Sequence, residues 1–251
     1  LGLSASALLI AYRSLKKQLA LNEMRDDFIS NISHELQTPV STVKVALEAL
    51  NTYDLKKDPK ITGEYLEMAS REVDRLGGLV GKVLNHSLLE DQSDWLQKEA
   101  CDLHDMVQKI MKTMEITIRE KGAEISLIPA EGPFMVLVDP VYVEGVIHNL
   151  IDNSLKYAGP EPEIEILLAS GSSGVTLSVR DNGPGIPNEF KEQVFEKFFR
   201  ITTGDRHDVK GYGLGLNFAS QVMEQHHGSI SQDNLPGGGC EFILHFSEEL
   251  E

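Results

Sequence analysis

The chain has 251 residues, enough for one sizeable core or for a long helical segment followed by a compact domain. Its 23 Lys and Arg residues stand against 39 Asp and Glu residues, and the formal net charge of −16 argues against nucleic acid and broad anionic membrane surfaces as partners. Cys101 and Cys240 have no CxxC spacing and no histidines at metal-ligand spacing, so the sequence indicates neither a disulfide framework nor a zinc site, and fits a reducing compartment.

The first residues have the composition of a membrane boundary. Residues 1–11 are uncharged and apolar, and Tyr12, Arg13, Lys16 and Lys17 follow without an acidic residue. A bilayer span needs about 20 apolar residues, so this stretch is too short by itself. An aromatic residue followed by cations is typical of a cytoplasmic membrane boundary. We interpret residues 1–12 as the end of a transmembrane helix; a frayed helix end or a truncated signal peptide are the alternatives.

A long amphipathic helix is predicted from about Arg13 to Asn51. Its apolar residues recur in steps of three or four, which is the pattern of a helix with one buried face. They are Met24, Phe28, Ile32, Leu36, Val40, Val43, Leu47 and Leu50. Residues 54–60 form a polar segment with a proline, which predicts a turn after this helix.

His34 occupies the polar side of this helix. At about 100° per residue it points away from both Ile32 and Leu36, toward water or a second domain. Glu35 is adjacent, Thr38 follows one turn later, and Pro39 predicts a bend because it removes a backbone donor. Taken alone, the arrangement also describes an ordinary surface histidine beside a glutamate.

A second helix follows the turn and carries a heptad pattern. Its apolar positions are Ala69, Val73, Leu76, Val80 and Val83. Two such helices cannot bury both apolar stripes alone, so we expect a dimer in which two hairpins form a four-helix bundle. Each of Gly77, Gly78 and Gly81 costs the helix about 1 kcal/mol relative to alanine. They permit either close backbone packing or bending.

Beyond about Glu99, the pattern changes to mixed helices and strands. A helix is predicted from Cys101 to Lys121, closed by Gly122, and another from Pro140 to Tyr157, capped by Asp139. A third helix is expected near Leu214–His226. The predicted strands are Glu124–Ile128, Phe134–Val138, Ile164–Ala169, Val175–Arg180, Ser229–Asp233 and Cys240–Phe246. This order indicates an α+β sandwich with helices on one face of a mixed sheet.

The helix at 140–157 carries a possible metal and nucleotide motif. Asn149 and Asn153 lie four residues apart on one helical face, with Lys156 and Tyr157 one turn further. Carboxamide oxygens can help to hold Mg²⁺. The isolated motif is weak, because Asn pairs on helices often only cap or hydrate.

Two glycine-rich segments follow later in the chain. Residues 181–186, DNGPGI, come directly after a strand, where Asp181 can accept from an amino group while Gly183 and Gly185 let the backbone approach a ligand. Residues 211–216, GYGLGL, open a helix, where free N–H groups and the helix dipole favour phosphate. Either segment alone would be a weak signal, and a tight turn is the simpler interpretation of the first.

Together with FISNISHELQTP at 28–39 and FEKFFR at 195–200, these segments resemble the motif boxes of sensor histidine kinases of two-component systems, in their usual order from about Leu15 onward. The resemblance implies a dimerisation and phosphotransfer domain at 13–92, a linker at 93–99, and a catalytic ATP-binding domain of the histidine kinase, gyrase and chaperone type at 100–251. It also implies a cytoplasmic location at the membrane face, a homodimer and a response regulator receiver domain as partner.

The resemblance implies a role for each matched residue. His34 would accept the phosphoryl group, Glu35 would hydrogen-bond its ring and take its proton, and Thr38 would orient water for a reverse phosphatase reaction. The implied ligands of ATP and Mg²⁺ are Asn153 as a direct metal ligand, Asn149 as its support, Lys156 near the phosphates, Tyr157 beside adenine, Asp181 as adenine reader, Arg200 at the γ-phosphate, and Gly183, Gly185, Gly211, Gly213, Leu214 and Gly215 along the nucleotide.

Some positions depart from the family pattern, and one position separates this chain from related ATPases. Gln37 stands where Lys or Arg is usual, Tyr212 stands where Thr or Ser is usual, and Arg206 and Lys210 in the expected lid are weaker candidates. Relatives that hydrolyse ATP carry a catalytic glutamate at the position of Asn149, so water is not the expected nucleophile here. The competing interpretations are a water-directed ATPase and a non-catalytic scaffold with a vestigial nucleotide site.

Overall fold

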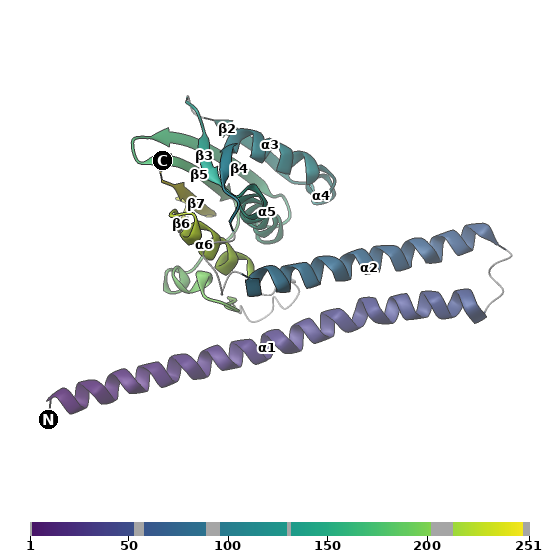
Figure 1. The fold of residues 1–251 in the computed structure, drawn as a ribbon, viewed down its shortest axis with the longest axis horizontal. Coiled ribbons are helices and arrows are strands. Elements are labelled where there is room, and N and C mark those ends of the chain that lie inside the picture. Colours follow the sequence, from purple (N-terminus) through teal and green to yellow (C-terminus); the bar gives the residue numbers. More distant parts are fainter. Residues whose placement is uncertain (1, 53–57, 89–95, 130–131, 202–212, 248–251) are drawn as a thin grey trace. The chain divides into compact units, whose positions relative to one another are not determined.

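The computed structural model describes residues 2–52, 58–88, 96–129, 132–201 and 213–247. The chain forms two compact units, Leu1–Asp91 and Gln92–Glu251. The first is helical, whereas the second combines helices and strands (Figure 1).

The first unit is a helical hairpin. Helix α1 spans Gly2–Thr52 and helix α2 spans Pro59–Leu88. Asp58 precedes α2 and accepts backbone hydrogen bonds from Lys60 (3.0 Å) and Ile61 (3.3 Å). The predicted turn is therefore shorter than 54–60, because Pro59 begins the second helix, where its missing N–H costs nothing.

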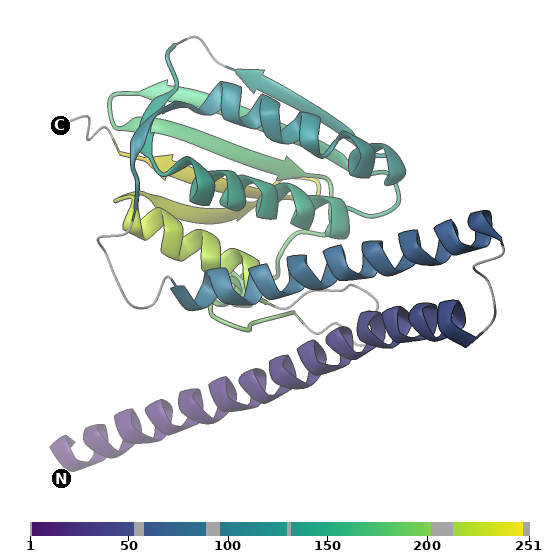
Figure 2. The same cartoon turned by 45° about the vertical axis from the view of Figure 1, so that its right-hand side comes forward.

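Helix α1 begins at Gly2, so residues 2–12 are helical and continuous with the helix predicted from about Arg13. The sequence predicts a bend at Pro39, and α1 continues through this buried residue as one helix. Figure 2 shows the ribbon change direction toward its C-terminal end. Within the described ranges, no helix combines the length and apolar character that a membrane crossing would need.

The hairpin leaves a second apolar stripe uncovered. On α2, Leu66, Val73 and Val80 are spaced by seven residues and remain 53%, 54% and 46% exposed. On α1, the corresponding exposed side chains are Ile29, Val40 and Leu47. The buried contacts between the helices use other positions, such as Ala46, which is fully buried. The side chain of Val83 lies outside the described residues.

The second unit has one five-stranded sheet and one two-stranded sheet. The larger sheet has the order β2-β4-β5-β7-β6, with β2 parallel to β4 and the other neighbours antiparallel. Its strands are β2 (Glu124–Pro129), β4 (Glu163–Gly171), β5 (Gly174–Asp181), β6 (Ser229–Asn234) and β7 (Cys240–Phe246). Strands β1 (Glu99–Asp102) and β3 (Met135–Val138) form the smaller antiparallel sheet.

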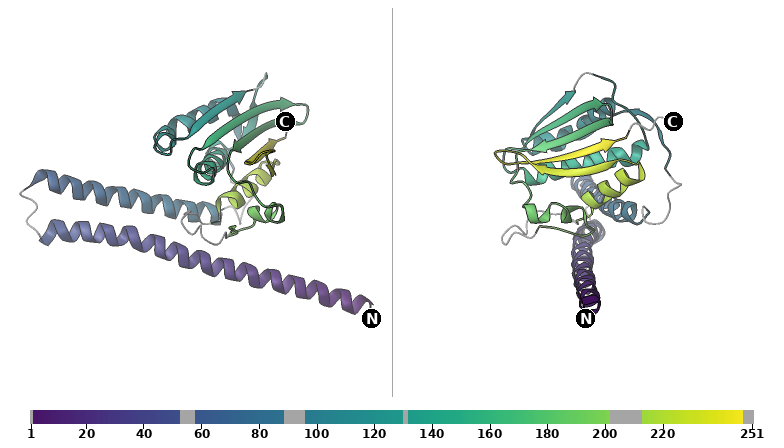
Figure 3. Two further views of the ribbon diagram at one scale, coloured as in Figure 1. Left: turned by 180° about the vertical axis from the view of Figure 1, so that it is seen from behind. Right: turned by 90° about the vertical axis from the view of Figure 1, so that its left-hand side faces the viewer.

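Helices cover one face of the larger sheet, as Figures 1 and 3 show. They are α3 (Leu103–Thr113), α4 (Glu115–Glu120), α5 (Pro140–Tyr157) and α6 (Gly215–Gln225). Alternate residues of β4, namely Ile164, Ile166 and Leu168, are almost completely buried against these helices. The predicted mixed sheet with helices on one face is confirmed.

The helix predicted at 101–121 was wrong in two respects. Cys101 and Asp102 belong to β1, where Cys101 lies opposite Val136, and Asp102 then caps α3 by accepting from the His104 N–H (2.8 Å). The helical segment is also divided at Met114 into α3 and α4. Its predicted end is correct, because Gly122 has a φ of 62° that favours glycine.

Candidate functional site

The phosphoacceptor candidate lies on the exposed side of α1. His34 is exposed, whereas Ile32 and Leu36 on either side are half-buried. The Thr38 hydroxyl, one turn later, donates to the carbonyl oxygen of His34 (3.3 Å). The histidine therefore projects away from the apolar stripe, with the threonine beside it along the helix.

Glu35 is turned toward the other helix of the hairpin. Its Oε2 atom lies 3.2 Å from Nη2 of Arg75 on α2. Arg75 also lies near Glu72, with 3.7 Å between Nη1 and Oε2. The carboxylate next to His34 is thus held by a cation from the facing helix.

The nucleotide candidate is built on α5. Asp139 caps this helix by accepting from the Val141 N–H (3.1 Å), and Pro140 occupies its first position. The sequence therefore places Asn149 and Asn153 on the last turns, where both are half-buried. Lys156 donates to Asp152 one turn back (2.5 Å).

Asp181 links the end of β5 to α5. Its Oδ1 accepts from the Gly183 N–H (2.9 Å) and its Oδ2 from the Ser154 hydroxyl (3.2 Å). Burial raises the pKa of the Asp181 carboxyl, although the hydrogen bonds from Gly183 and Ser154 act in the opposite direction. A buried carboxylate with acceptor capacity left is suited to recognise an amino group.

The first glycine-rich loop lies against α5 and β6. A Cβ on Gly183 would lie 2.8 Å from Asp181 Oδ1 and 3.1 Å from the Tyr157 carbonyl oxygen, so only glycine fits without displacement. Gly185 has a φ of 72°. Asn234 fixes this loop by accepting from the Ile186 N–H (2.8 Å) and donating to the Ile186 carbonyl (2.7 Å).

The segment at 195–200 joins the start of α6. The Phe198 N–H donates to the Gly213 carbonyl (2.9 Å), and Asn217 of α6 donates to the Phe195 carbonyl (2.7 Å). Gly213 has a φ of 65°, and a Cβ there would lie 2.6 Å from the backbone of Phe198. Phe198 itself has a positive φ of 68°, which is uncommon for a side chain of this size.

The start of α6 also reaches the asparagines of α5. A Cβ built on Gly215 would lie 3.6 Å from Cγ of Asn149. Leu214 precedes the helix and is buried, and within the described part of the chain no side chain caps the first N–H groups of α6. Uncapped N–H groups at a helix start favour a phosphate.

The structure therefore brings three of the predicted segments together. Asp181 accepts a hydrogen bond from Ser154 of α5, whereas Gly183 lies close to Tyr157 and Gly215 lies close to Asn149. Tyr157 and Arg200 are both exposed. Gly211, Tyr212, Arg206 and Lys210 lie outside the described residues. The glycines let the backbone come close to a ligand, and Asp181 is a buried carboxylate, so the arrangement suits an adenine nucleotide.

Models of two known domain families match the chain. Residues 24–92 match the model of the His Kinase A (phospho-acceptor) domain, and residues 138–250 match that of the histidine kinase-, DNA gyrase B- and HSP90-like ATPase. RprX, a sensor protein of Bacteroides fragilis, is 32% identical to the chain over 231 residues, which are 91% of this chain and 44% of RprX. The chain belongs to the sensor histidine kinases. It spans less than half the length of RprX.

Solved histidine kinases share the fold of this chain. AdeS from Acinetobacter baumannii has 25% identity and a TM-score of 0.62, covering 86% of this chain and 98% of that chain. ThkA, solved in complex with the response regulator protein TrrA, has 22% identity and a TM-score of 0.61, covering 88% of this chain and 61% of that chain. The predicted order of a helical hairpin followed by an ATPase-type α/β unit is confirmed.

Several residues that hold the nucleotide candidate together were not predicted from the sequence. Ser154, Asn217 and Asn234 are single polar residues without a repeated pattern, and only the fold places them against their partners. His226 is also buried and accepts from the Asp139 N–H through Nε2 (2.9 Å). The run of glycines at 237–239 was a usable signal, because a Cβ on Gly239 would lie 2.1 Å from the Asp181 carbonyl oxygen.

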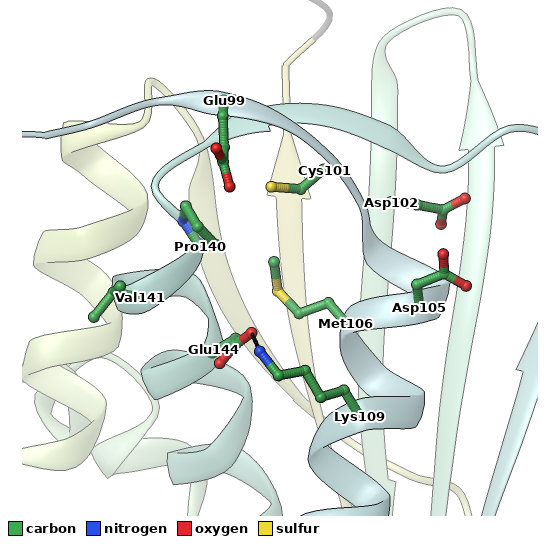
Figure 4. Close-up of a pocket in the computed structure, with 9 residues that line it drawn as sticks. All are labelled: Glu99, Cys101, Asp102, Asp105, Met106, Lys109, Pro140, Val141 and Glu144. Carbon is green, nitrogen blue, oxygen red and sulfur yellow. Dashed lines mark hydrogen bonds and ion pairs between the residues drawn. The ribbon is translucent and has the colours of Figure 1, made fainter.

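A separate pocket of about 390 Å³ opens near the other end of α5 (Figure 4). It is lined by Glu99, Cys101, Asp102, Asp105, Met106, Lys109, Pro140, Val141 and Glu144. Lys109 crosses it and pairs with Glu144 (2.7 Å). Burial, followed by the nearby carboxylates of Glu99 and Glu144, raises the pKa of the Cys101 thiol. None of the predicted site residues lines this pocket.

Proposed function

We propose that this kinase transfers the γ-phosphoryl group of ATP to His34 and then passes it to an aspartate of a response regulator. The observation that supports this most is the combination of an exposed His34 with a nucleotide candidate whose α5 carries Asn149 where related hydrolases carry a catalytic glutamate. The amide of Asn149 cannot take a proton from water, which favours a protein side chain as acceptor. This also argues against a water-directed ATPase.

Different residues of the second unit bind different parts of ATP. Asp181 accepts from the adenine amino group and Tyr157 lies beside the ring. The N–H groups at Gly213, Leu214 and Gly215 donate to phosphate oxygens, together with the side chains of Lys156 and Arg200 and with Gly211, which lies outside the described residues. Asn153, supported by Asn149, would hold Mg²⁺, which supplies charge stabilisation when bound. Because these groups are fixed by the fold, most of the rate enhancement is positioning.

His34 and Glu35 perform the transfer. A nitrogen of the neutral imidazole attacks the γ-phosphorus, the bond from phosphorus to the ADP oxygen breaks, and Glu35 takes the proton of the ring. The phosphoryl group then passes from His34 to the carboxylate of the regulator. In a reverse reaction, the hydroxyl oxygen of Thr38, one turn from His34, orients water toward a phosphorylated aspartate.

A homodimer is part of the proposal. The exposed stripes of the hairpin, with Leu66, Val73 and Val80 on α2, are too apolar and too regular for a solvated face. Packing them against a second copy would complete a four-helix bundle. In this proposal, residues 13–92 serve dimerisation and phosphotransfer and residues 100–251 bind ATP. Of the predicted linker at 93–99, Gln97 and Glu99 are attached to the second unit, through Asp139 and through β1.

Binding to a response regulator and attachment to a membrane are proposed for the whole protein. ThkA, a relative of the same fold, was solved with a response regulator, and we propose the same class of partner here. Tyr12 and the cations that follow it support attachment to the cytoplasmic face of a membrane in the full-length protein.

Incubating the chain with γ-labelled ATP and Mg²⁺, then adding candidate regulators, tests the proposal. We expect label on the kinase, followed by its transfer to one regulator. ADP release without phosphorylated protein would favour the water-directed ATPase. Absence of binding to an ATP analogue with Mg²⁺ would favour the non-catalytic scaffold.

A further inference from the structure

The ion pair between Glu35 and Arg75 spans the helical hairpin. The two residues are 40 positions apart in the sequence, and their charged atoms are 3.2 Å apart. The side chain of Glu35 is 24% exposed and that of Arg75 is 40% exposed, so the pair is partly screened from water. The contact fixes a carboxylate that directly follows the exposed His34.

Glu72 holds Arg75 from the same helix. Its Oε2 atom is buried, accepts no hydrogen bond and lies 3.7 Å from Nη1 of Arg75. The guanidinium group therefore lies between two carboxylates, one on α2 and one on α1. A planar guanidinium can face both at once with separate nitrogens, whereas the compact ammonium of lysine cannot.

The pair contributes little to folding. Partly exposed ion pairs are worth at most about 1 kcal/mol, so loss of Arg75 should leave the hairpin folded. Its effect on a reaction can be larger, because a long glutamate side chain otherwise samples several rotamers and only some bring its oxygen to the histidine. The same contact can thus matter little for stability and much for rate.

We propose that Arg75 is a positioning residue for the phosphorylation of His34, acting through Glu35. This inference rests on the proposed function. Arg75 keeps its own proton throughout, because a guanidinium is always charged in proteins. It restrains Glu35, which receives the imidazole proton as the nitrogen–phosphorus bond forms and the bond to ADP breaks.

The test compares R75Q, R75K, E35Q and the double variant with the unaltered kinase. We expect R75Q to lower the maximal rate constant of labelling about tenfold, part of the 10²–10⁴-fold that a positioned base contributes, with the ATP concentration at half-maximal rate unchanged. R75K should recover part of the rate. In the E35Q background, R75Q should cause no further loss, because Arg75 then has nothing to position.

Arg71 provides the matched control. It lies one turn before Arg75 on the same helix and pairs with Glu67 at 3.8 Å, with both side chains about 70% exposed. R71Q removes the same charge and should label at the normal rate. Circular dichroism and the dimer mass should be unchanged in every variant.

The results distinguish a failure of the role of Arg75 from a failure of the role of Glu35. A normal rate for R75Q, or the same fall in the E35Q background as in the unaltered kinase, overturns the positioning role of Arg75. A normal rate for E35Q instead overturns the proposed role of Glu35 as base. A change confined to the ATP concentration at half-maximal rate also contradicts the inference.

Discussion

The burial of Asp181 lowers the stability of the folded protein at neutral pH, but it leaves a carboxylate placed for the proposed contact with adenine. It is 7% exposed and is held by Ser154 and Gly183. Because burial raises its pKa, the folded protein holds a proton on this group more readily than the unfolded chain does. The contribution of Asp181 to stability therefore falls as pH rises through the range between the two pKa values, and stays low at neutral pH.

Replacing Asp181 by Asn should separate these two effects. The amide keeps the shape and can still accept from the Gly183 N–H, so we expect the free energy of unfolding at pH 7 to rise by about 1 kcal/mol. ATP affinity should fall about 10- to 100-fold, because the charge-assisted acceptor for the adenine amino group is lost. Thermal unfolding measures the change in stability, and titration with an ATP analogue measures the change in affinity.

Asp233 is an exposed carboxylate on β6, and Asp233→Asn is the control. A D181N variant with normal ATP affinity would contradict the role of Asp181.

At the level of elements, one hydrogen-bonded junction connects the two helices that carry the nucleotide motifs. His226 follows α6, donates through Nδ1 to the Val222 carbonyl (2.7 Å) and accepts from the Asp139 N–H at the start of α5. Asp139 also accepts from the Gln97 N–H (2.8 Å). The start of the second unit, α5 and α6 are therefore joined at one point.

This junction should be sensitive to acid. Burial lowers the pKa of His226, and the nearby Lys98 and His227 act in the same direction, whereas the Val222 carbonyl and Asp139 oppose them. Since the unfolded chain binds the proton more readily, stability is lost as pH falls below about 6.5, the ordinary histidine pKa, and the loss is complete once pH passes the lower pKa of the folded protein.

The variant His226→Gln should remove this pH dependence. Glutamine can still accept from the Asp139 N–H, so we expect a loss of only about 1 kcal/mol at pH 7.5 and a smaller fall in Tm between pH 7.5 and 5.5 than in the unaltered protein. His148→Gln, at an exposed position of α5, should leave the dependence unchanged. An H226Q variant with the full pH dependence would assign the acid sensitivity to another group.

The glycines of α2 offer a test of the dimer. Gly77 lies between Val73 and Val80 on the exposed apolar stripe, whereas Gly78 points about 100° away, and a Cβ at either position meets nothing within 4 Å in the hairpin. Gly78→Ala should stabilise the helix by about 1 kcal/mol without changing the dimer. Gly77→Ala should weaken the dimer measurably by sedimentation, because the added methyl group meets the second copy. Equal effects of both changes would argue against packing through this stripe.

The elements that the sequence predicted well are those with long patterns. The exposure of His34, the ends of α5 and the positions of strands β2 to β7 along the chain follow from periodicity and capping. The helix at 101–121 was wrong because pairing of Cys101 with Val136 overrode a helical pattern. The contact between Glu35 and Arg75 had no sequence signal, since it depends on the register of two helices.

At the level of the whole molecule, each unit carries only half of the proposed reaction. In the proposal, the first supplies His34 and Glu35, whereas the second supplies Asn153 and the other nucleotide ligands. Neither unit by itself contains both an acceptor and an ATP site. Phosphorylation therefore requires a chain, or a pair of chains, that contributes both.

Labelling of His34 with γ-labelled ATP tests the central claim most directly. The unaltered kinase should incorporate an acid-labile, base-stable label, as expected for a phosphorus–nitrogen bond. His34→Ala should fold and bind ATP without label, because the exposed side chain leaves no core cavity, and Asn153→Ala should lose label with its metal site. Acid-stable label, or label that persists in the His34→Ala variant, would contradict the account.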